Sequence, residues 1–271
     1  MDSTTRVLTI LIILFAFAAV AIAIQFVRRR REAFPLIASD AYTAMPQVVG
    51  AGIESGRPVL IAHNGDALGG TNTPFALIAA EMTYQIAYRA AVGGVAPVMA
   101  ISESTVLPLA YGTLTRAHKA RNRLAGFISP DHVHWAPAGN RSMAFAALLT
   151  GMLRTHNAAG AVFTGNYGSE LALPLWSATR QRVPTIAATH NIEGQAIAFA
   201  LADHAMLGDE FSLSGAYLGS DSTALGGVVA ASILRIAVIV GLLIPTLYIV
   251  GDEVTGGAIS RLLAGLFGGG S

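Results

Sequence analysis

Short apolar runs recur along the middle of the chain, each bounded by glycine, proline, asparagine or serine. The runs are rich in valine and isoleucine and are continuous instead of alternating, which is typical of parallel strands buried on both faces. This feature restricts the fold more than any other in the sequence. The runs occupy residues 58–63, 96–101, 132–137, 159–165 and 183–189, with 204–208 as a sixth candidate.

Longer segments with helical character separate these runs. Strand and helix in regular succession favour an α/β fold with right-handed crossovers. We therefore predict a single doubly wound, mostly parallel sheet, a Rossmann-like domain, over residues 58–226. The predicted helices are 73–91, 105–122, 141–155, 169–182 and 193–203.

Two long apolar segments, 7–27 and 228–250, flank this domain. A helix of about 20 residues spans the roughly 30 Å core of a bilayer, so both segments are predicted to be transmembrane helices. The first is too long for a signal peptide and is followed at once by Arg28, Arg29, Arg30 and Arg31, which favours a retained anchor.

Positive charge stays on the cytoplasmic side of a membrane, so the four arginines predict the topology. Residues 1–6 would lie outside, the connector 28–57 and the domain inside, and the tail 251–271 outside, as an interfacial helix or a frayed terminus. Arg235, inside the second apolar segment, is expected to extend to the cytoplasmic interface or to contact another subunit within the membrane.

The chain is 53% hydrophobic and 12% charged, against roughly 25% charged in an average soluble domain. Predicted helices such as 73–91 are apolar on nearly every face, and such helices must be buried somewhere. We therefore expect a homo-oligomer. The net charge of +1 gives no basic field for nucleic acid, and the chain has no cysteine.

Polar residues follow four of the predicted strands, at the edge where open parallel sheets bind ligands; these loops are 63–72, 102–105, 164–170 and 189–194. Gly165 and Gly168 would let a phosphate approach backbone amides, and Ser169 would cap the next helix. These loops contain no lysine and no phosphate-loop motif, so a plain strand-to-helix turn is the competing interpretation. The candidate ligand-binding residues are His63, Asn64, Asp66, Gly165, Asn166, Gly168, Ser169, Glu170, His190 and Asn191.

A metal site built from His63, Asp66, His190 and Glu193 is a weaker hypothesis. Two histidines and a carboxylate can hold a transition metal, but no recognised ligand spacing is present, and capping or surface polarity explains the same residues. No cofactor and no catalytic residue is predicted, and enzymatic activity is less expected than its absence.

Four segments resemble, in order, a prokaryotic membrane-protein family known as a domain of unknown function, 6754 type. They are HNGDALGGTNTPFALIAAEMTYQIAYRAA, PVMAISESTVLPLAYGTLTRA, GNYGSELALPLW and IAATHNIEGQAIAFALADHAMLGDEFSLSGAYLG. The pattern departs from the family at Asp209, Ser212 and Ser214. The resemblance implies a protein of the prokaryotic plasma (inner) membrane and implies no particular activity.

Three functions are therefore expected, in this order. The first is a structural role in a large homo-oligomeric membrane assembly, with the lipid bilayer, further copies and other membrane proteins as partners. The second is a cytoplasmic sensor of a small anion or nucleotide. The third is a metal-assisted hydrolase.

Overall fold

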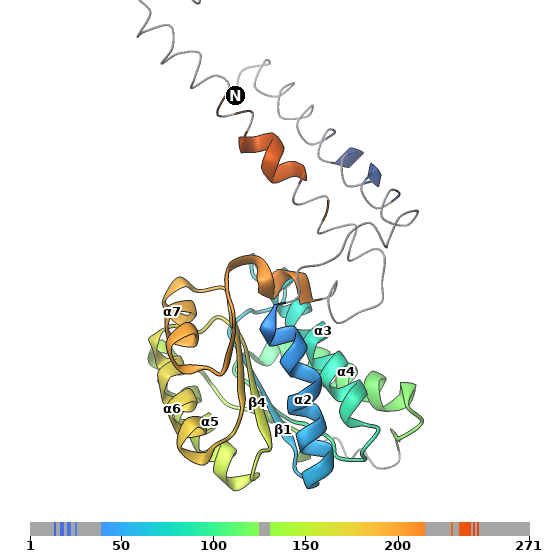
Figure 1. The fold of residues 1–271 in the computed structure, drawn as a ribbon, viewed down its shortest axis with the longest axis vertical. Helices are drawn as coiled ribbons and strands as arrows, with labels where there is room; N and C mark the ends of the chain where they lie inside the picture. Colours follow the sequence, from blue (N-terminus) through green and yellow to red (C-terminus); the bar gives the residue numbers. More distant parts are fainter. Residues whose placement is uncertain are drawn as a thin grey trace, which may run out of the picture. The chain divides into compact units, whose positions relative to one another are not determined.

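The computed structural model describes residues 39–124 and 131–214, together with residues 14, 17, 18, 21, 22, 25, 229, 233–239, 241 and 243. The chain divides into two compact units, one of residues 35–221 and one of residues 1–34 with 222–271. The first unit contains the sheet and is shown as a ribbon in Figure 1.

Six parallel strands form one sheet in the order β3-β2-β1-β4-β5-β6. This order reverses direction between β1 and β4, as in doubly wound folds. It confirms the predicted α/β class with a single parallel sheet. The strands are β1 (Val59–Asn64), β2 (Val98–Ile101), β3 (Val133–Trp135), β4 (Gly160–Gly165), β5 (Thr185–Thr189) and β6 (His204–Met206).

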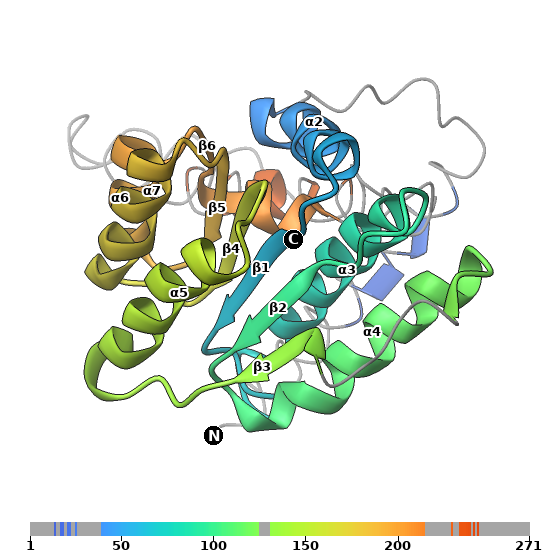
Figure 2. The ribbon, with the colours of Figure 1, turned by 90° about the horizontal axis from the view of Figure 1, so that it is seen from below.

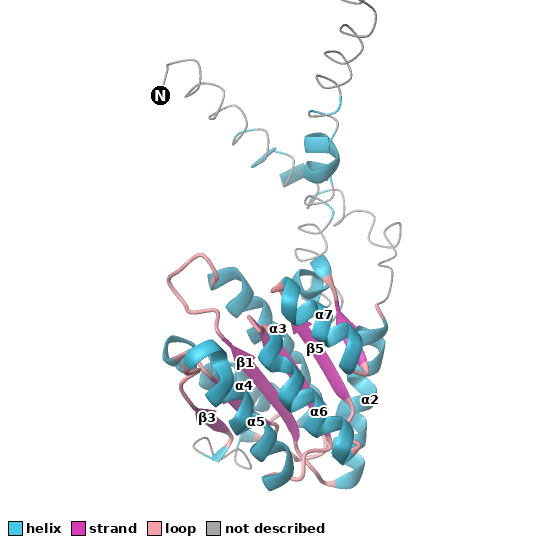
Figure 3. Ribbon diagram, turned by 90° about the vertical axis from the view of Figure 1, so that its left-hand side faces the viewer, coloured by secondary structure: helices cyan, strands magenta, loops and turns pink. Residues whose placement is uncertain are grey.

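Helices cover both faces of the sheet, as Figures 2 and 3 show. The core on one face joins α2, α3 and α4 to alternate strand residues such as Ile61, and the other joins α5, α6 and α7 to neighbours such as Leu60. The α-helices of this unit are α2 (Asp40–Ser55), α3 (Thr73–Ala90), α4 (Leu107–Ala120), α5 (Met143–Thr155), α6 (Ala172–Gln181) and α7 (Ile192–Leu201).

Short 3-10 helices precede three of these α-helices, and one follows the last strand. They are η2 (Ser104–Val106), η5 (Asn140–Ser142), η6 (Ser169–Leu171) and η7 (Gly208–Leu213).

Helix α2 lies within residues 28–57, which were predicted to form a connector. Its residues Met45 and Val49 are buried in the core beside β1 and α3. The compact unit therefore begins well before residue 58. Pro46 lies inside the helix, and Gly50 and Gly52 follow it, so the segment lacks the helix-favouring composition of the others.

Within the described part of the chain, no helix combines the length and the apolar character needed to cross a membrane. Both predicted transmembrane segments, 7–27 and 228–250, lie largely outside the described residues. The arginines at 28–31, on which the predicted topology rests, and the tail 251–271 lie outside them entirely.

Candidate functional site at the carboxyl edge of the sheet

The carboxyl ends of β1, β4 and β5 meet where the strand order reverses. Asn64 pairs in register with Gly165, and Gly165 with Thr189. Three of the four predicted loops therefore begin side by side. Since the chain leaves β1 toward one face of the sheet and β4 toward the other, this point is where open α/β sheets bind ligands.

Three asparagines connect these strand ends by hydrogen bonds. The Asn64 side chain donates to the Asn166 carbonyl at 2.7 Å, and the Asn166 backbone amide donates to the Asn64 carbonyl at 2.7 Å. The Asn191 side chain donates to Asn166 Oδ1 at 3.2 Å. Between them Gly165 has φ 110°, and a Cβ there would lie 2.3 Å from the Asn64 carbonyl oxygen. This glycine is required for the close passage of two strand ends.

The loop after β4 has a carboxylate at the position where an anion was expected. The Gly168 backbone amide donates to Glu170 Oε1 at 2.8 Å, and Glu170 is 8% exposed. Ser169 is the first residue of η6, and Gly168 is the N-cap residue before it. Ser169 therefore does not occupy the predicted capping position. The Gly168 amide is thus already satisfied within the protein.

A polar recess of about 430 Å³ opens beside this loop, on the side of the sheet covered by α5 and α7. Arg141 and Ser142, which line it, adopt left-handed φ values of 48° and 53°. Such a conformation is costly for non-glycine residues and is often retained at functional sites. The recess is lined by Arg141, Ser142, Asn166, Gly168, Ser169, Glu170, Asn191 and Glu193.

On the opposite face of the sheet lies an acid–imidazole pair, Asp66 and His190. His190 Nε2 is 3.5 Å from Asp66 Oδ1, and the His190 ring stacks on Phe75 with centroids 4.0 Å apart and planes at 7°. Asp66 is 2% exposed and has φ 59°. His63 contacts Thr164 at 3.2 Å and borders a cavity of about 10 Å³ with residues of α3 and α4.

Burial shifts the protonation of this group toward the neutral forms. It raises the pKa of Asp66 to about 7, with a further contribution from the charge of Glu103. It lowers the pKa of His63 to about 4, with a smaller contribution from His190, and it lowers the pKa of His190 itself. Burial therefore disfavours both the carboxylate form of Asp66 and the imidazolium form of His190.

Unpartnered polar atoms gather at this edge. Among the buried side chains of the described residues, His63 Nε2, Asn64 Oδ1, both carboxylate oxygens of Asp66 and His190 Nδ1 have no hydrogen-bond partner. More than nine in ten buried polar groups in folded proteins are paired, so such a concentration needs a cause. A site that receives a polar ligand or ordered water supplies one.

The four residues of the metal hypothesis do not form one cluster. His63, Asp66 and His190 lie toward α3, whereas Glu193 lines the recess on the other face. In the described ranges, no group of three or more His, Cys, Asp or Glu side chains is arranged to hold a metal ion.

Sequence reasoning missed Arg141, Ser142 and Phe75, and it gave Glu103 no role although it placed the loop 102–105 at this edge. Arg141 and Ser142 follow the edge strand β3, and they reach the β4 and β5 loops only because α5 starts beside them. Gly139, which precedes them with φ 71°, is the one local signal of an unusual turn.

The fold and this edge define a doubly wound α/β protein with a polar crevice at its topological switch point. A family model described as Domain of unknown function (DUF6754) matches residues 2–257, and the chain belongs to this family. No curated protein and no solved structure matches the chain.

Proposed function

We propose that the protein is a membrane-anchored sensor whose α/β domain binds a small polar ligand at the carboxyl edge of its sheet. The observation that carries this proposal is the polar recess of about 430 Å³ at that edge, where Arg141 lies with the carboxylates Glu170 and Glu193. Asn64, which bonds to Asn166 of the recess, also has a buried Oδ1 without a partner among the described residues. A buried polar atom costs about 1–3 kcal/mol when left without a partner, so a ligand that pairs with Asn64 Oδ1 gains that free energy.

The charges of the recess fit a ligand with a cationic amine better than a ligand that is a bare phosphate. A Cβ added at Gly168 would lie 2.9 Å from Glu170 Oε2 and 3.5 Å from Glu193 Oε2, so both carboxylates face one point beside this glycine. Arg141 lines the same recess and adds one site for an anion. A zwitterion such as an amino acid satisfies both charges, whereas a nucleotide would meet two carboxylates and an amide already in use.

The anchor in this proposal is the pair of apolar segments 7–27 and 228–250, with the domain in the cytoplasm of a prokaryotic cell. In the second segment, the described residues 233–239 are helical, and Ile236 and Val238 are 62% and 60% exposed. Exposed apolar side chains on an apolar helix support contact with lipid.

Ligand binding is tested with the full chain in mild detergent. Native mass spectrometry would detect a retained small molecule, and thermal unfolding would be measured with a panel of L-amino acids, inorganic phosphate and ATP. At 100 times Kd a ligand stabilises by about 2.7 kcal/mol, or roughly 5–11 °C for a domain of this size. We expect an amino acid to give this shift and phosphate to give none.

Variants then locate the site. Arg141→Gln should abolish the shift, whereas Arg154→Gln, on the outer side of α5, should leave it unchanged. No shift with any compound and no retained mass would refute the proposal. An equal loss in both variants would place binding elsewhere.

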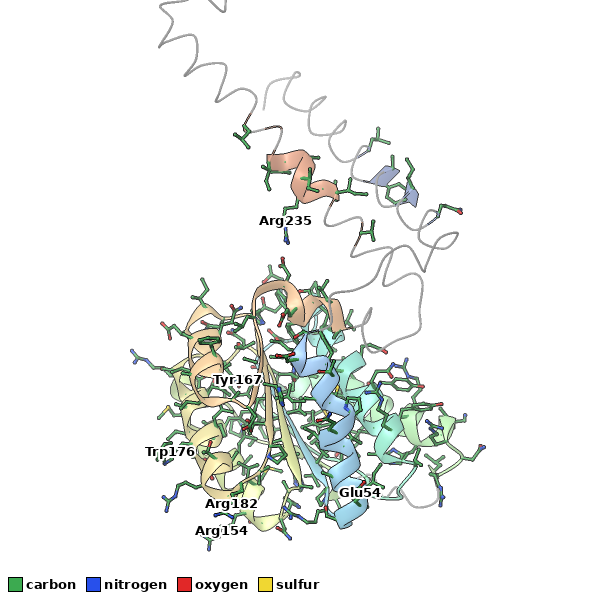
Figure 4. The ribbon with its side chains drawn as sticks, in the orientation of Figure 1. Glu54, Arg154, Tyr167, Trp176, Arg182 and Arg235 are labelled. Carbon is green, nitrogen blue, oxygen red and sulfur yellow. The ribbon has the colours of Figure 1, made fainter. Side chains whose placement is uncertain are left out.

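A second candidate is the homo-oligomeric membrane assembly. Large apolar side chains are exposed on the outer helices, with Trp176 60% exposed on α6 and Phe199 74% on α7, and Figure 4 shows Trp176 at the outer surface of the domain. Trp176 also lines an open groove of about 830 Å³ between α5 and α6, together with Arg154 and Arg180. Tryptophan and arginine are the residue types that contribute most at protein interfaces.

Self-association is tested by the mass of the detergent-solubilised particle. Trp176→Ala should lower the oligomer mass, whereas Trp135→Ala, a 51% exposed tryptophan on the edge strand β3, should not. A monomeric wild-type particle would exclude this candidate. No observation in the described part of the chain favours the metal-assisted hydrolase over these two.

A further inference from the structure

The segment η7, residues Gly208–Leu213, connects the candidate site to the two ends of the domain. It follows the last strand, and the chain then continues toward the second apolar segment. Phe211 of η7 stacks on Phe75, which in turn stacks on His190, and Glu210 of η7 accepts a hydrogen bond from Ser39 at the start of α2. These contacts suggest a route by which a change at the site reaches the rest of the domain.

The first inward connection is a stack of aromatic rings. Phe211 of η7 is fully buried and lies parallel to Phe75, with centroids 6.2 Å apart and planes at 9°. Phe75 in turn stacks on His190 at 4.0 Å, and His190 contacts Asp66 at 3.5 Å. A displacement of the His190 ring would therefore displace Phe75, which contacts Phe211.

The second inward connection is a side-chain bridge. Gln195 of α7 donates through Nε2 to the Thr189 carbonyl at 3.1 Å, and its Oε1 accepts from the Gly208 backbone amide at 3.3 Å. Thr189 is the last residue of β5 and immediately precedes His190. The start of η7 is thus attached to the strand end that carries the acid–imidazole pair.

Outward, Glu210 joins η7 to the first turn of α2. Glu210 Oε2 accepts from the Ser39 hydroxyl at 3.1 Å and from the Leu207 amide at 3.1 Å, and the Tyr42 hydroxyl donates to the Glu210 carbonyl. Ser39 and Tyr42 lie where the chain enters the domain after the first apolar segment. Both connections to the predicted membrane anchors are therefore held together at η7.

We propose that η7 is the output element of the site, so that a change at Asp66 and His190 alters how η7 holds the two chain segments that lead to the anchors. The aromatic stack Phe75–Phe211 and the Gln195 bridge transmit the change. This inference rests on the proposed function and names the way in which that site is coupled to the membrane. Coupling of this kind requires a perturbation at one end to be felt at the other through the stack.

The test is hydrogen–deuterium exchange of the full chain in mild detergent, read in peptides that cover 207–214 and 39–45. Asp66→Asn serves as the perturbation, because it changes the partner of His190 without a ligand. We expect it to change exchange in both peptides by at least about five-fold, the lower end of typical coupling. In a Phe75→Leu background the change should disappear, and Gln195→Leu should reduce it.

Phe145→Leu is the matched control. Phe145 is fully buried in the core on the opposite face of the sheet, so its truncation loosens packing and leaves the stack intact. The Asp66→Asn effect should persist in this background. The inference is overturned if Asp66→Asn leaves both peptides unchanged, or if its effect is the same in the Phe75→Leu and Phe145→Leu backgrounds.

Failure of the proposed function gives a different result. The exchange experiment contains no ligand, so coupling can be present even when mass spectrometry finds no bound molecule. Conversely, an amino acid can bind through Arg141 while η7 does not respond.

Discussion

His63 and Asp66 should make opposite contributions to the pH dependence of stability. The pKa of Asp66 rises on folding from 3.8 to about 7, so the folded state binds the proton more tightly, and stability falls as pH rises from about 4 to 7. The pKa of His63 falls on folding from 6.5 to about 4, so stability rises over pH 4 to 6.5. In the wild-type protein the two slopes largely cancel.

Single substitutions should reveal each slope. One pKa unit corresponds to about 1.36 kcal/mol, so ionised Asp66 costs up to about 4 kcal/mol above pH 7 and about 1.6 kcal/mol at pH 5. Asp66→Asn should therefore stabilise the protein, by more at pH 8 than at pH 5. For His63→Gln the corresponding gain is up to about 3 kcal/mol at pH 4 and vanishes above pH 6.5.

Thermal unfolding followed by circular dichroism at pH 4 to 8 measures these differences in the full chain. About 1 kcal/mol moves the midpoint by roughly 2–4 °C at this domain size, so Asp66→Asn should gain up to about 8–16 °C at pH 8 and about 3–6 °C at pH 5. Background titrations cancel because each variant is compared with the wild type at the same pH. A difference that stays constant from pH 4 to 8 would refute the assigned burial and protonation of Asp66.

Four further predictions concern packing, hydrogen bonding and an exposed side chain, and thermal unfolding tests each of them. Gly194→Ala should lower the midpoint strongly, because its Cβ would lie 2.0 Å from a backbone carbonyl oxygen of the β4–α6 loop. Gly151→Ala, in a helix with no heavy atom within 4 Å of the added Cβ, should stabilise by up to about 1 kcal/mol. Asp203→Ala should cost about 1–3 kcal/mol, because Asp203 Oδ2 accepts from the Thr185 amide at 2.8 Å and its hydroxyl at 2.9 Å. The exposed Glu54→Ala should change stability by less than about 0.5 kcal/mol.

Much of the fold follows from local sequence patterns. All six predicted strands are present within a few residues of their predicted bounds, and the five predicted helices correspond to α3 through α7. The reason is that buried parallel strands need continuous apolar runs, and a crossover needs a helix between them. Helix α2 follows no strand and forms no crossover, so the alternation that identifies the others does not identify it.

The sequence predicted at which edge of the sheet the candidate site lies, but it did not predict which side chains meet there. Strand ends carry His63, Asn166 and His190 to one edge because parallel strands share a direction. Which residues meet depends on strand order, and only the adjacency of β1 and β4 brings Asn64 beside Gly165. The recruitment of Arg141 from the loop after the edge strand depends on how α5 packs, which no local pattern encodes.

The division of the site between two faces has a simpler origin. Successive side chains of a strand point to opposite faces, so the neighbours His63 and Asn64 cannot belong to the same pocket. His63 joins Asp66, His190 and the stack that leads to η7, whereas Asn64 joins the asparagine chain of the recess. In our proposal, a ligand in the recess reaches the acid–imidazole pair through the loop after β5, where His190 and Asn191 are adjacent residues. His190 is therefore the residue through which we propose that both halves of the site act on η7, so Phe75, its stacking partner, is the position to change first.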